Sequence, residues 1–177
     1  MHVSRQGWAL HPLAVPRPLR HWLCDRGSLT QRLKSRCANF RVHPLVTGHA
    51  RPHLDETALL GLPPRARAYV RQVLLVCNET TVVFAHSVLP LSGLRGGWQG
   101  ITRLGARSLG EALFRNPRIQ RQSLEYRCIR PQHMLHRRLG KTLPGAPRVL
   151  WARRSRFCLN GHPLLVTEVF LPAIMAL

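Results

Sequence analysis

The sequence predicts a single α+β domain built on an antiparallel β-sheet. Two observations predict this class. Pairs of apolar, β-branched segments follow one another through short turns, and the helical segments stand apart from those pairs instead of alternating with them. A chain of 177 residues, of which 45% are hydrophobic, is long enough to bury a core, so we expect one domain over residues 1–177.

Two capping-box patterns predict where helices begin. Residues 17–38, "RPLRHWLCDRGSLTQRLKSRCA", are expected to form two short helices broken at a glycine, the second starting with "SLTQ" and Ser28 at its N-cap. A second box, "SLGE", has Ser108 at its N-cap, and "DETALLGLPP" predicts a helical turn. The first amides of a helix lack an intrahelical acceptor. The starts at Leu29 and Leu109 therefore either donate to a bound carboxylate or are ordinary helix starts.

Strands are expected in the segments between and after these helices. The run "RARAYVRQVLLVCNETTVVFAHSVLPL" predicts two strands with a turn at "NET", and "RQSLEYRCI" predicts a third. The last two strands, in "VLWARRSRFCL" and "PLLVTEVFL", are joined at Asn160-Gly161. That dipeptide between apolar runs is the strongest short-range signal for a hairpin.

A two-residue loop would set the register of this last hairpin. Counting outward from Asn160 and Gly161 places Arg153 opposite Glu168, on a face that is otherwise mostly apolar. On an earlier strand, alternation places Arg71 on one face with large apolar groups. Structural ion pairs are one interpretation of these charges. We favour an enclosed polar site for a small ligand, because Glu168 is one of only seven acids and lies in the most apolar segment.

The formal net charge of +20 first suggests a nucleic-acid partner. The charge is spread along the whole chain, however, and only Lys34 and Lys141 are lysines, so arginine is used throughout. Aromatic residues are not interleaved as in RNA-binding strands. We therefore expect no nucleic-acid partner, and infer that the charge speeds the encounter with a small anionic substrate.

The cysteines and histidines do not form a recognisable metal motif. The five cysteines are widely spaced without a CxxC pair, which predicts reduced, buried thiols in a cytoplasmic protein. Only His133 and His136 lie three residues apart, in a basic segment expected to be an exposed loop or short helix. We expect no metal and no other cofactor.

The N-terminal residues do not resemble a secretory signal, since they lack a continuous apolar core. They are basic and free of acids, as in a transit peptide, but are poor in serine and contain three prolines. We expect residues 1–16 to be poorly ordered. The longest apolar run, "PLLVTEVFLPAIMAL", is interrupted by a charge and prolines, so no stable membrane insertion is expected.

Several stretches resemble one known family. They are "WLCDRGSLTQRL", "VRQVLLVCN", "VLPLSGL", "LGARSLGEALF" and "LWARRSRFCLNGHPLLVTEVFLPA", in that order, between about residues 18 and 173. They are similar to the bacterial chorismate pyruvate-lyases, which catalyse the first committed step of ubiquinone biosynthesis. The basic segment 127–148 looks longer than in that family. The resemblance implies an antiparallel sheet whose enclosed ligand pocket is closed by helical flaps.

The resemblance also implies roles for individual residues. Arg71 matches the arginine that holds the carboxylate of the aromatic ring, and Glu168 matches the glutamate at the hydroxyl end of the pocket. Leu29 and Leu109 match two flap positions that contact the ligand through their backbone. Arg153 either keeps Glu168 ionised or binds the second carboxylate of the substrate.

The implied activity is a cofactor-independent carbon–oxygen lyase. It would remove pyruvate from chorismate to give 4-hydroxybenzoate, in a cytoplasmic and monomeric protein whose tightly held product limits turnover. The alternative is a non-catalytic sensor of small aromatic acids, and a basic nucleic-acid-binding protein comes third.

Overall fold

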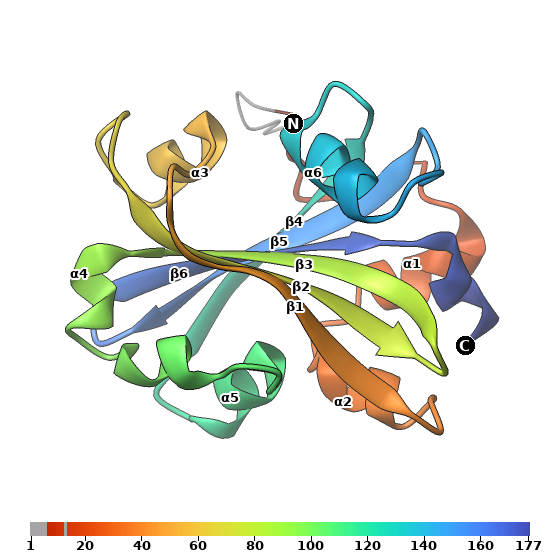
Figure 1. Ribbon diagram of the computed structural model, residues 1–177, viewed down its shortest axis with the longest axis horizontal. Coiled ribbons are helices and arrows are strands. Elements are labelled where there is room, and N and C mark those ends of the chain that lie inside the picture. The colour runs from red at the N-terminus through yellow and green to blue at the C-terminus, as the bar shows by residue number, and fades with distance from the viewer. Residues whose placement is uncertain (1–6, 13) are drawn as a thin grey trace.

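The computed structural model describes residues 7–12 and 14–177, and shows one α+β domain around a six-stranded antiparallel sheet (Figure 1). Each strand runs antiparallel to its neighbours, in the order β1-β2-β3-β6-β5-β4. The strands are β1 Phe40–Ala50, β2 Ala68–Cys77, β3 Thr80–Pro90, β4 Gln120–Ile129, β5 Leu150–Leu159 and β6 His162–Phe170. The predicted fold class is confirmed.

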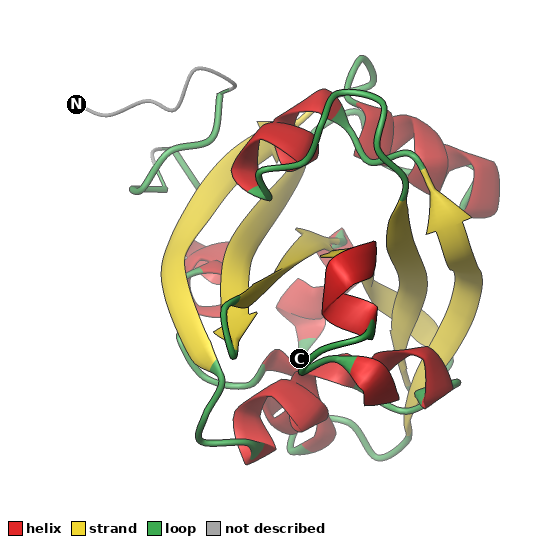
Figure 2. Cartoon of the chain, turned by 90° about the vertical axis from the view of Figure 1, so that its left-hand side faces the viewer, coloured by secondary structure: helices red, strands yellow, loops and turns green. Residues whose placement is uncertain are grey.

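Short helices cover both sides of the sheet. The α-helices are α1 Arg17–Leu23, α2 Leu29–Lys34, α3 Leu54–Leu59, α4 Leu91–Leu94, α5 Leu109–Arg115 and α6 Met134–Thr142, and two 3₁₀ turns span Gln99–Arg103 and Pro172–Ala176. Figure 1 shows α2 and α5 on one side of the sheet and α3 and α6 on the other, and Figure 2 shows how strongly the strands curve. We call the α2 and α5 side the inner face. Within the described residues, no helix combines the length and apolarity that crossing a membrane requires.

The last hairpin has the predicted register. Asn160 and Gly161 have φ angles of 50° and 78°, the left-handed conformation that this tight turn demands. Arg153 pairs with Glu168, and the neighbouring pairs continue without a shift from Leu159 opposite His162 to Trp151 opposite Phe170.

One strand was missed by the sequence analysis, because β1 lacks a clean alternation. It contains Pro44 and Gly48, and both residue types are disfavoured inside strands. The structure accommodates Pro44 at an irregularity, since the register with β2 shifts between Pro44 and Val46. As an edge strand, β1 tolerates the missing backbone donor of proline.

Part of the N-terminal segment packs against the domain, contrary to the expectation for residues 1–16. The side chain of Trp8 is 1% exposed, and Ala9 exchanges two backbone hydrogen bonds with Tyr126, at 2.9 and 2.8 Å. The buried indole explains this order, because it fills a place in the core beside β4 and β5. Residues 1–6 and 13 lie outside the described residues.

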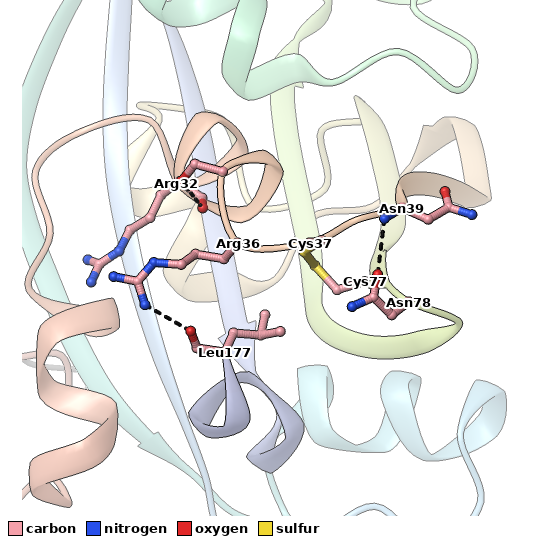
Figure 3. The surroundings of a disulfide bond; sticks show 8 residues. Arg32, Arg36, Cys37, Asn39, Cys77, Asn78 and Leu177 are labelled. Carbon is pink, nitrogen blue, oxygen red and sulfur yellow. Dashed lines mark hydrogen bonds between the residues drawn. A yellow bond between two sulfur atoms is a disulfide. The ribbon is translucent and has the colours of Figure 1, made fainter.

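The prediction that all cysteines are reduced and buried is wrong for this structure. Cys37 and Cys77 form a disulfide, shown in Figure 3, while Cys24, Cys128 and Cys158 are free and only half-buried. The pairing of β1 with β2 explains the bond, because it places the residues just before β1 beside the end of β2. The disulfide ties the segment that follows α2 to the sheet.

Candidate functional site

The inner face of the sheet carries a cavity beneath α2 and α5. Strands β1, β2, β3, β4, β5 and β6 all contribute to its walls, and the helix starts at Leu29 and Leu109 close it. All five residues singled out from the sequence line this one cavity: Leu29, Arg71, Leu109, Arg153 and Glu168. Leu29 and Glu168 are far apart in the sequence, so the fold brings these residues together.

Arg153 and Glu168 form the expected pair across β5 and β6. The Nε of Arg153 donates to Oε2 of Glu168 at 2.6 Å, and the arginine side chain is only 1% exposed. Its Nη1 donates to the carbonyl of Trp22 at 3.1 Å and to that of Asp25. These contacts use several donors of Arg153 and fix its guanidinium beside Glu168.

Arg71 is a buried cation that no described acid neutralises. Its side chain is 3% exposed, and its Nη2 donates to the carbonyls of Gly105 and Arg107 at 3.0 and 2.9 Å. Burial lowers the pKa of Arg71, with Tyr69 acting in the opposite direction. A buried guanidinium without a counter-ion is costly, so an anion in the cavity would be strongly attracted to it.

Leu29 and Leu109 are the first residues of α2 and α5, as the capping boxes predicted. Ser28 Oγ accepts from the amide of Gln31, and Ser108 Oγ accepts from that of Glu111, both at 3.3 Å. The two helix starts also meet each other, since the hydroxyls of Thr30 and Ser108 lie 2.6 Å apart in a buried hydrogen bond. We call α2 and α5 the flaps, and this hydrogen bond, which joins them over the cavity, the latch.

Arg121 is a cavity residue that the sequence analysis missed. It lies at the start of β4, where the pairing with β5 shifts: Arg121 is opposite Phe157, but Leu124 is opposite Ser155. The extra residue is a β-bulge, which puts Arg121 and Leu124 on the same face although they are three apart. Simple alternation assigns these two residues to opposite faces. Arg121 could therefore be assigned to the cavity only if the bulge were known, and the sequence does not reveal the bulge.

A second polar cluster lies on the opposite face of the sheet, which we call the outer face. Arg154 donates to Glu125 at 2.6 Å and to Asp55 at 3.0 Å. Nearby, Nε2 of His86 lies 2.9 Å from Oε1 of Glu56, and both side chains are almost fully buried. The buried acids and bases of this face are therefore matched with one another.

The outer face also holds a group of side chains with metal-ligand chemistry. Donor atoms of His53, Glu56 and His86 lie within 4.8 Å of one another. Burial by itself would raise the pKa of Glu56, but the charge and hydrogen bond of His86, with smaller contributions from His53, lower it to about 2. Within this group, Glu56 and His86 make the closest contact, at 2.9 Å.

The two histidines considered from the sequence lie elsewhere. His133 caps α6, where its Nδ1 accepts from the amide of Leu135 at 3.2 Å, and His136 Nε2 is 2.8 Å from the carbonyl of Pro147. His133 is half-buried, not fully solvated, and burial, with the charge of Arg127 second, lowers its pKa to about 4.

The fold and the cavity together define a class of protein: a small α+β domain with an arginine-lined cavity between a curved sheet and two short helices. Comparison with known proteins defines the family. The family model for chorismate lyase matches residues 9–176, and the chain belongs to that family.

Individual relatives agree with this assignment. The chain is 56% identical over 169 residues to the probable chorismate pyruvate-lyase of Thiobacillus denitrificans, covering 96% of this chain and 90% of that protein. It is 49% identical over 170 residues to the probable chorismate pyruvate-lyase of Nitrosomonas europaea, covering 96% of each.

Solved structures resemble the fold without close sequence similarity. A GntR-family transcriptional regulator from Bacillus cereus superposes with a TM-score of 0.56 at 11% identity, covering 77% of this chain and 94% of that one. The effector domain of PhnF from Mycobacterium smegmatis gives 0.52 at 15% identity, covering 83% and 90%. At this level of identity the likeness shows a shared fold only.

Proposed function

We propose that the protein is a chorismate pyruvate-lyase, which converts chorismate into 4-hydroxybenzoate and pyruvate. The observation that carries the proposal is the coincidence of the family match with the cavity. The residues that the family resemblance assigned to the ligand all line one enclosed space, and that space contains one acid and uncompensated arginines. In the pathway, this reaction would supply the aromatic ring of ubiquinone.

The proposed binding mode follows from the charges in the cavity. Arg71 holds the ring carboxylate of chorismate, because the N–H groups of its Nε and Nη1 donate to no described partner. For a bidentate anchor, the carboxylate also takes an N–H of Nη2 from the carbonyl of Gly105 or Arg107. Glu168 receives the ring hydroxyl, and Arg153 fixes the position of that carboxylate. The backbone amides of Leu29 and Leu109, at the starts of α2 and α5, complete the anion site.

The reaction is an elimination that makes the ring aromatic. The bond between the ring and the ether oxygen breaks, and its electrons leave with the enolpyruvyl group. The hydrogen on the hydroxyl-bearing carbon leaves as a proton, and its bonding electrons complete the aromatic ring. The enolpyruvyl group takes up a proton and becomes pyruvate. Aromatisation makes this strongly favourable, so the protein's task is to orient the substrate and stabilise charge, with Glu168 relaying the proton.

Closure of the flaps has a consequence for turnover. The 2.6 Å hydrogen bond between Thr30 and Ser108 has to break, or the flaps have to move as one body, before the product leaves. We therefore propose that release of 4-hydroxybenzoate limits the rate.

The proposal includes a monomer in the cytoplasm that needs no cofactor and no nucleic-acid partner. Thiols are kept reduced in the cytoplasm, so the disulfide between Cys37 and Cys77 is the observation that argues against this location. Light scattering of the purified protein would give the mass of a monomer, and thiol alkylation in intact cells would report the state of the two cysteines.

The experiment that tests the proposal is a turnover assay. Purified protein mixed with chorismate should release 4-hydroxybenzoate and pyruvate in equal amounts, without added metal and in the presence of EDTA. Absence of both products from a folded protein would refute the proposal. If the protein then still binds 4-hydroxybenzoate, the sensor of aromatic acids is the better description. Salt-sensitive binding of DNA or RNA that 4-hydroxybenzoate does not affect would favour the third candidate.

A further inference from the structure

The cavity contains more positive charge than one carboxylate needs. Three arginines line it, at positions 71, 121 and 153, against Glu168 as the one acid among its described lining residues. Arg153 is paired with Glu168 at 2.6 Å. Two guanidinium groups, those of Arg71 and Arg121, are left with no acid in ion-pair contact among the described residues.

Arg121 is held in place by neutral partners. Its Nε donates to Ser155 Oγ at 3.0 Å and its Nη1 to the carbonyl of Arg26 at 2.7 Å. Its guanidinium carbon lies 5.4 Å from the ring centre of Phe157 and 5.6 Å from that of Phe114. Its Nη2 has no hydrogen-bond partner within residues 7–12 and 14–177. The guanidinium of Arg121 is thus held in one orientation, and its Nη2 is available to donate to a ligand.

Burial, followed by the nearby charge of Arg153, lowers the pKa of Arg121 to about 10. The side chain therefore stays positively charged at neutral pH. A bulged strand, a half-buried position and two aromatic contacts are more than a surface arginine needs. They place a fixed positive charge in a cavity whose one described acid, Glu168, is already in an ion pair with Arg153.

The positions of the two arginines relative to Glu168 match the shape of the substrate. Across the sheet, Arg71 pairs with Ser87, Ser87 with Val166, and Val166 with Ser155, the residue that Arg121 contacts. Arg71 on β2 and Arg121 on β4 therefore flank the cavity from opposite sides, near this row of paired residues. Glu168 lies two residues along β6 from Val166 and faces the same side of the sheet. Chorismate likewise carries two carboxylates, of which the second hangs from the ring carbon beside the hydroxyl.

We propose that Arg121 binds the enolpyruvyl carboxylate of chorismate, and so distinguishes the doubly charged substrate from the singly charged aromatic product. This inference rests on the proposed function. The two uncompensated arginines then bind different groups. Arg71 binds the ring carboxylate, which substrate and aromatic product share, and Arg121 binds the enolpyruvyl carboxylate, which becomes the carboxylate of pyruvate.

The test compares two ligands in two proteins. The ligands are 4-hydroxybenzoate and 3-(carboxymethoxy)-4-hydroxybenzoate. The second compound carries an additional carboxylate on an ether next to the hydroxyl. In the wild type, the added carboxylate should tighten binding in calorimetry. In Arg121→Gln, the dianion should bind roughly 10- to 100-fold more weakly than in the wild type, while the affinity for 4-hydroxybenzoate changes by less than about 3-fold.

Two controls separate binding from folding and from net charge. Arg118→Gln removes the same charge from an exposed position three residues earlier, and should leave the affinities of both ligands unchanged. Arg121→Lys keeps the charge but loses the planar fork, and should recover part of the affinity for the dianion. Thermal unfolding of each variant shows whether it is folded before its affinities are compared.

Kinetics give a second readout. In Arg121→Gln, kcat/KM for chorismate should fall at least 10-fold, while inhibition by 4-hydroxybenzoate is nearly unchanged. If a folded Arg121→Gln protein loses affinity for both ligands equally, or for neither, the assignment of Arg121 is wrong even though the enzyme is a lyase. If the wild type has no turnover, the proposed function fails, while the calorimetric comparison still decides whether Arg121 reads a second carboxylate.

Discussion

The two faces of the sheet use buried charge in opposite ways. On the outer face, Arg154 lies between Glu125 and Asp55, at 2.6 and 3.0 Å, and stacks 4.3 Å above the ring of Trp8. On the inner face, Arg71 and Arg121 donate hydrogen bonds only to carbonyl and hydroxyl oxygens among the described residues. Of the seven acids in the chain, Asp55, Glu56 and Glu125 contact basic side chains of the outer face. The described lining of the cavity contains one acid against three arginines.

We propose that this difference separates structural arginines from those that bind the ligand. Arg153 and Arg154 are neighbours in the chain and point to opposite faces, so both look alike in the sequence. A buried ion pair contributes little net stability, but removal of one partner leaves the other charge uncompensated. An uncompensated arginine is the reverse case, because its removal relieves the cost of a buried charge. In our proposal, the partner of such an arginine is the ligand.

The largest effect is expected from breaking the outer-face cluster. Arg154→Met should lower the free energy of unfolding by about 3–5 kcal/mol, because Asp55 and Glu125 lose their shared cation. Urea unfolding measures the loss. The folded fraction should bind 4-hydroxybenzoate with nearly the wild-type affinity, since Arg154 points away from the cavity. A stable variant with lost binding would reverse the assignment of the two faces.

The matching change on the inner face should have the opposite pattern. Arg71→Met should weaken binding of 4-hydroxybenzoate and of chorismate about 100-fold, because a bidentate, desolvated ion pair is lost. The free energy of unfolding should change by no more than about 1 kcal/mol, as the lost bonds to Gly105 and Arg107 are offset by relief of the buried charge. Unchanged binding, measured by calorimetry, would show that Arg71 is not the anchor.

The pairing of Glu56 on the outer face predicts a dependence on pH. Its pKa is lowered from 4.5 to about 2 in the folded protein, so its contribution to stability is complete above pH 4.5 and is lost as the pH falls towards 2. Between pH 4.5 and pH 3, this group should account for a loss of about 2 kcal/mol. The Glu56→Gln variant should have a lower free energy of unfolding at pH 7, and this free energy should change less between pH 4.5 and pH 3, as measured by chemical unfolding. If the variant loses stability equally steeply over this range, groups other than Glu56 cause the loss.

The smallest effect concerns the latch between the flaps. Thr30→Val keeps the shape of the side chain but removes its 2.6 Å hydrogen bond to Ser108, which remains available to cap α5. Release of 4-hydroxybenzoate should become about 2- to 10-fold faster, in line with the loss of about one hydrogen bond. Stopped-flow displacement measures this rate. If release is not faster, the latch does not control opening.

What the sequence could predict depended on how regular each element is. The register of Arg153 with Glu168 followed from a two-residue loop and a period of two, and both hold in the structure. Arg71 was found in the same way, because β2 alternates without interruption around it. The helix starts before Leu29 and Leu109 were found because a serine cap is a local signal.

What the sequence could not predict depends on irregular or long-range structure. The bulge in β4 turns Arg121 to the inner face, and the same kind of irregularity at Pro44 concealed β1. The disulfide of Cys37 with Cys77 requires the pairing of β1 with β2, so it could not be found without that strand. The matched charges of the outer face join α3, β3, β4 and β5, which only the three-dimensional structure brings together.

The most direct test of the account is a crystal structure of the complex with 4-hydroxybenzoate. The account predicts the ligand in the inner cavity, its carboxylate within hydrogen-bond distance of the Arg71 guanidinium and of a flap amide, and its hydroxyl on Glu168. Arg121 should bear no ligand carboxylate in that product complex. A ligand bound on the outer face, or a carboxylate held by Arg153 or Arg121 while Arg71 keeps only its bonds to Gly105 and Arg107, would contradict it.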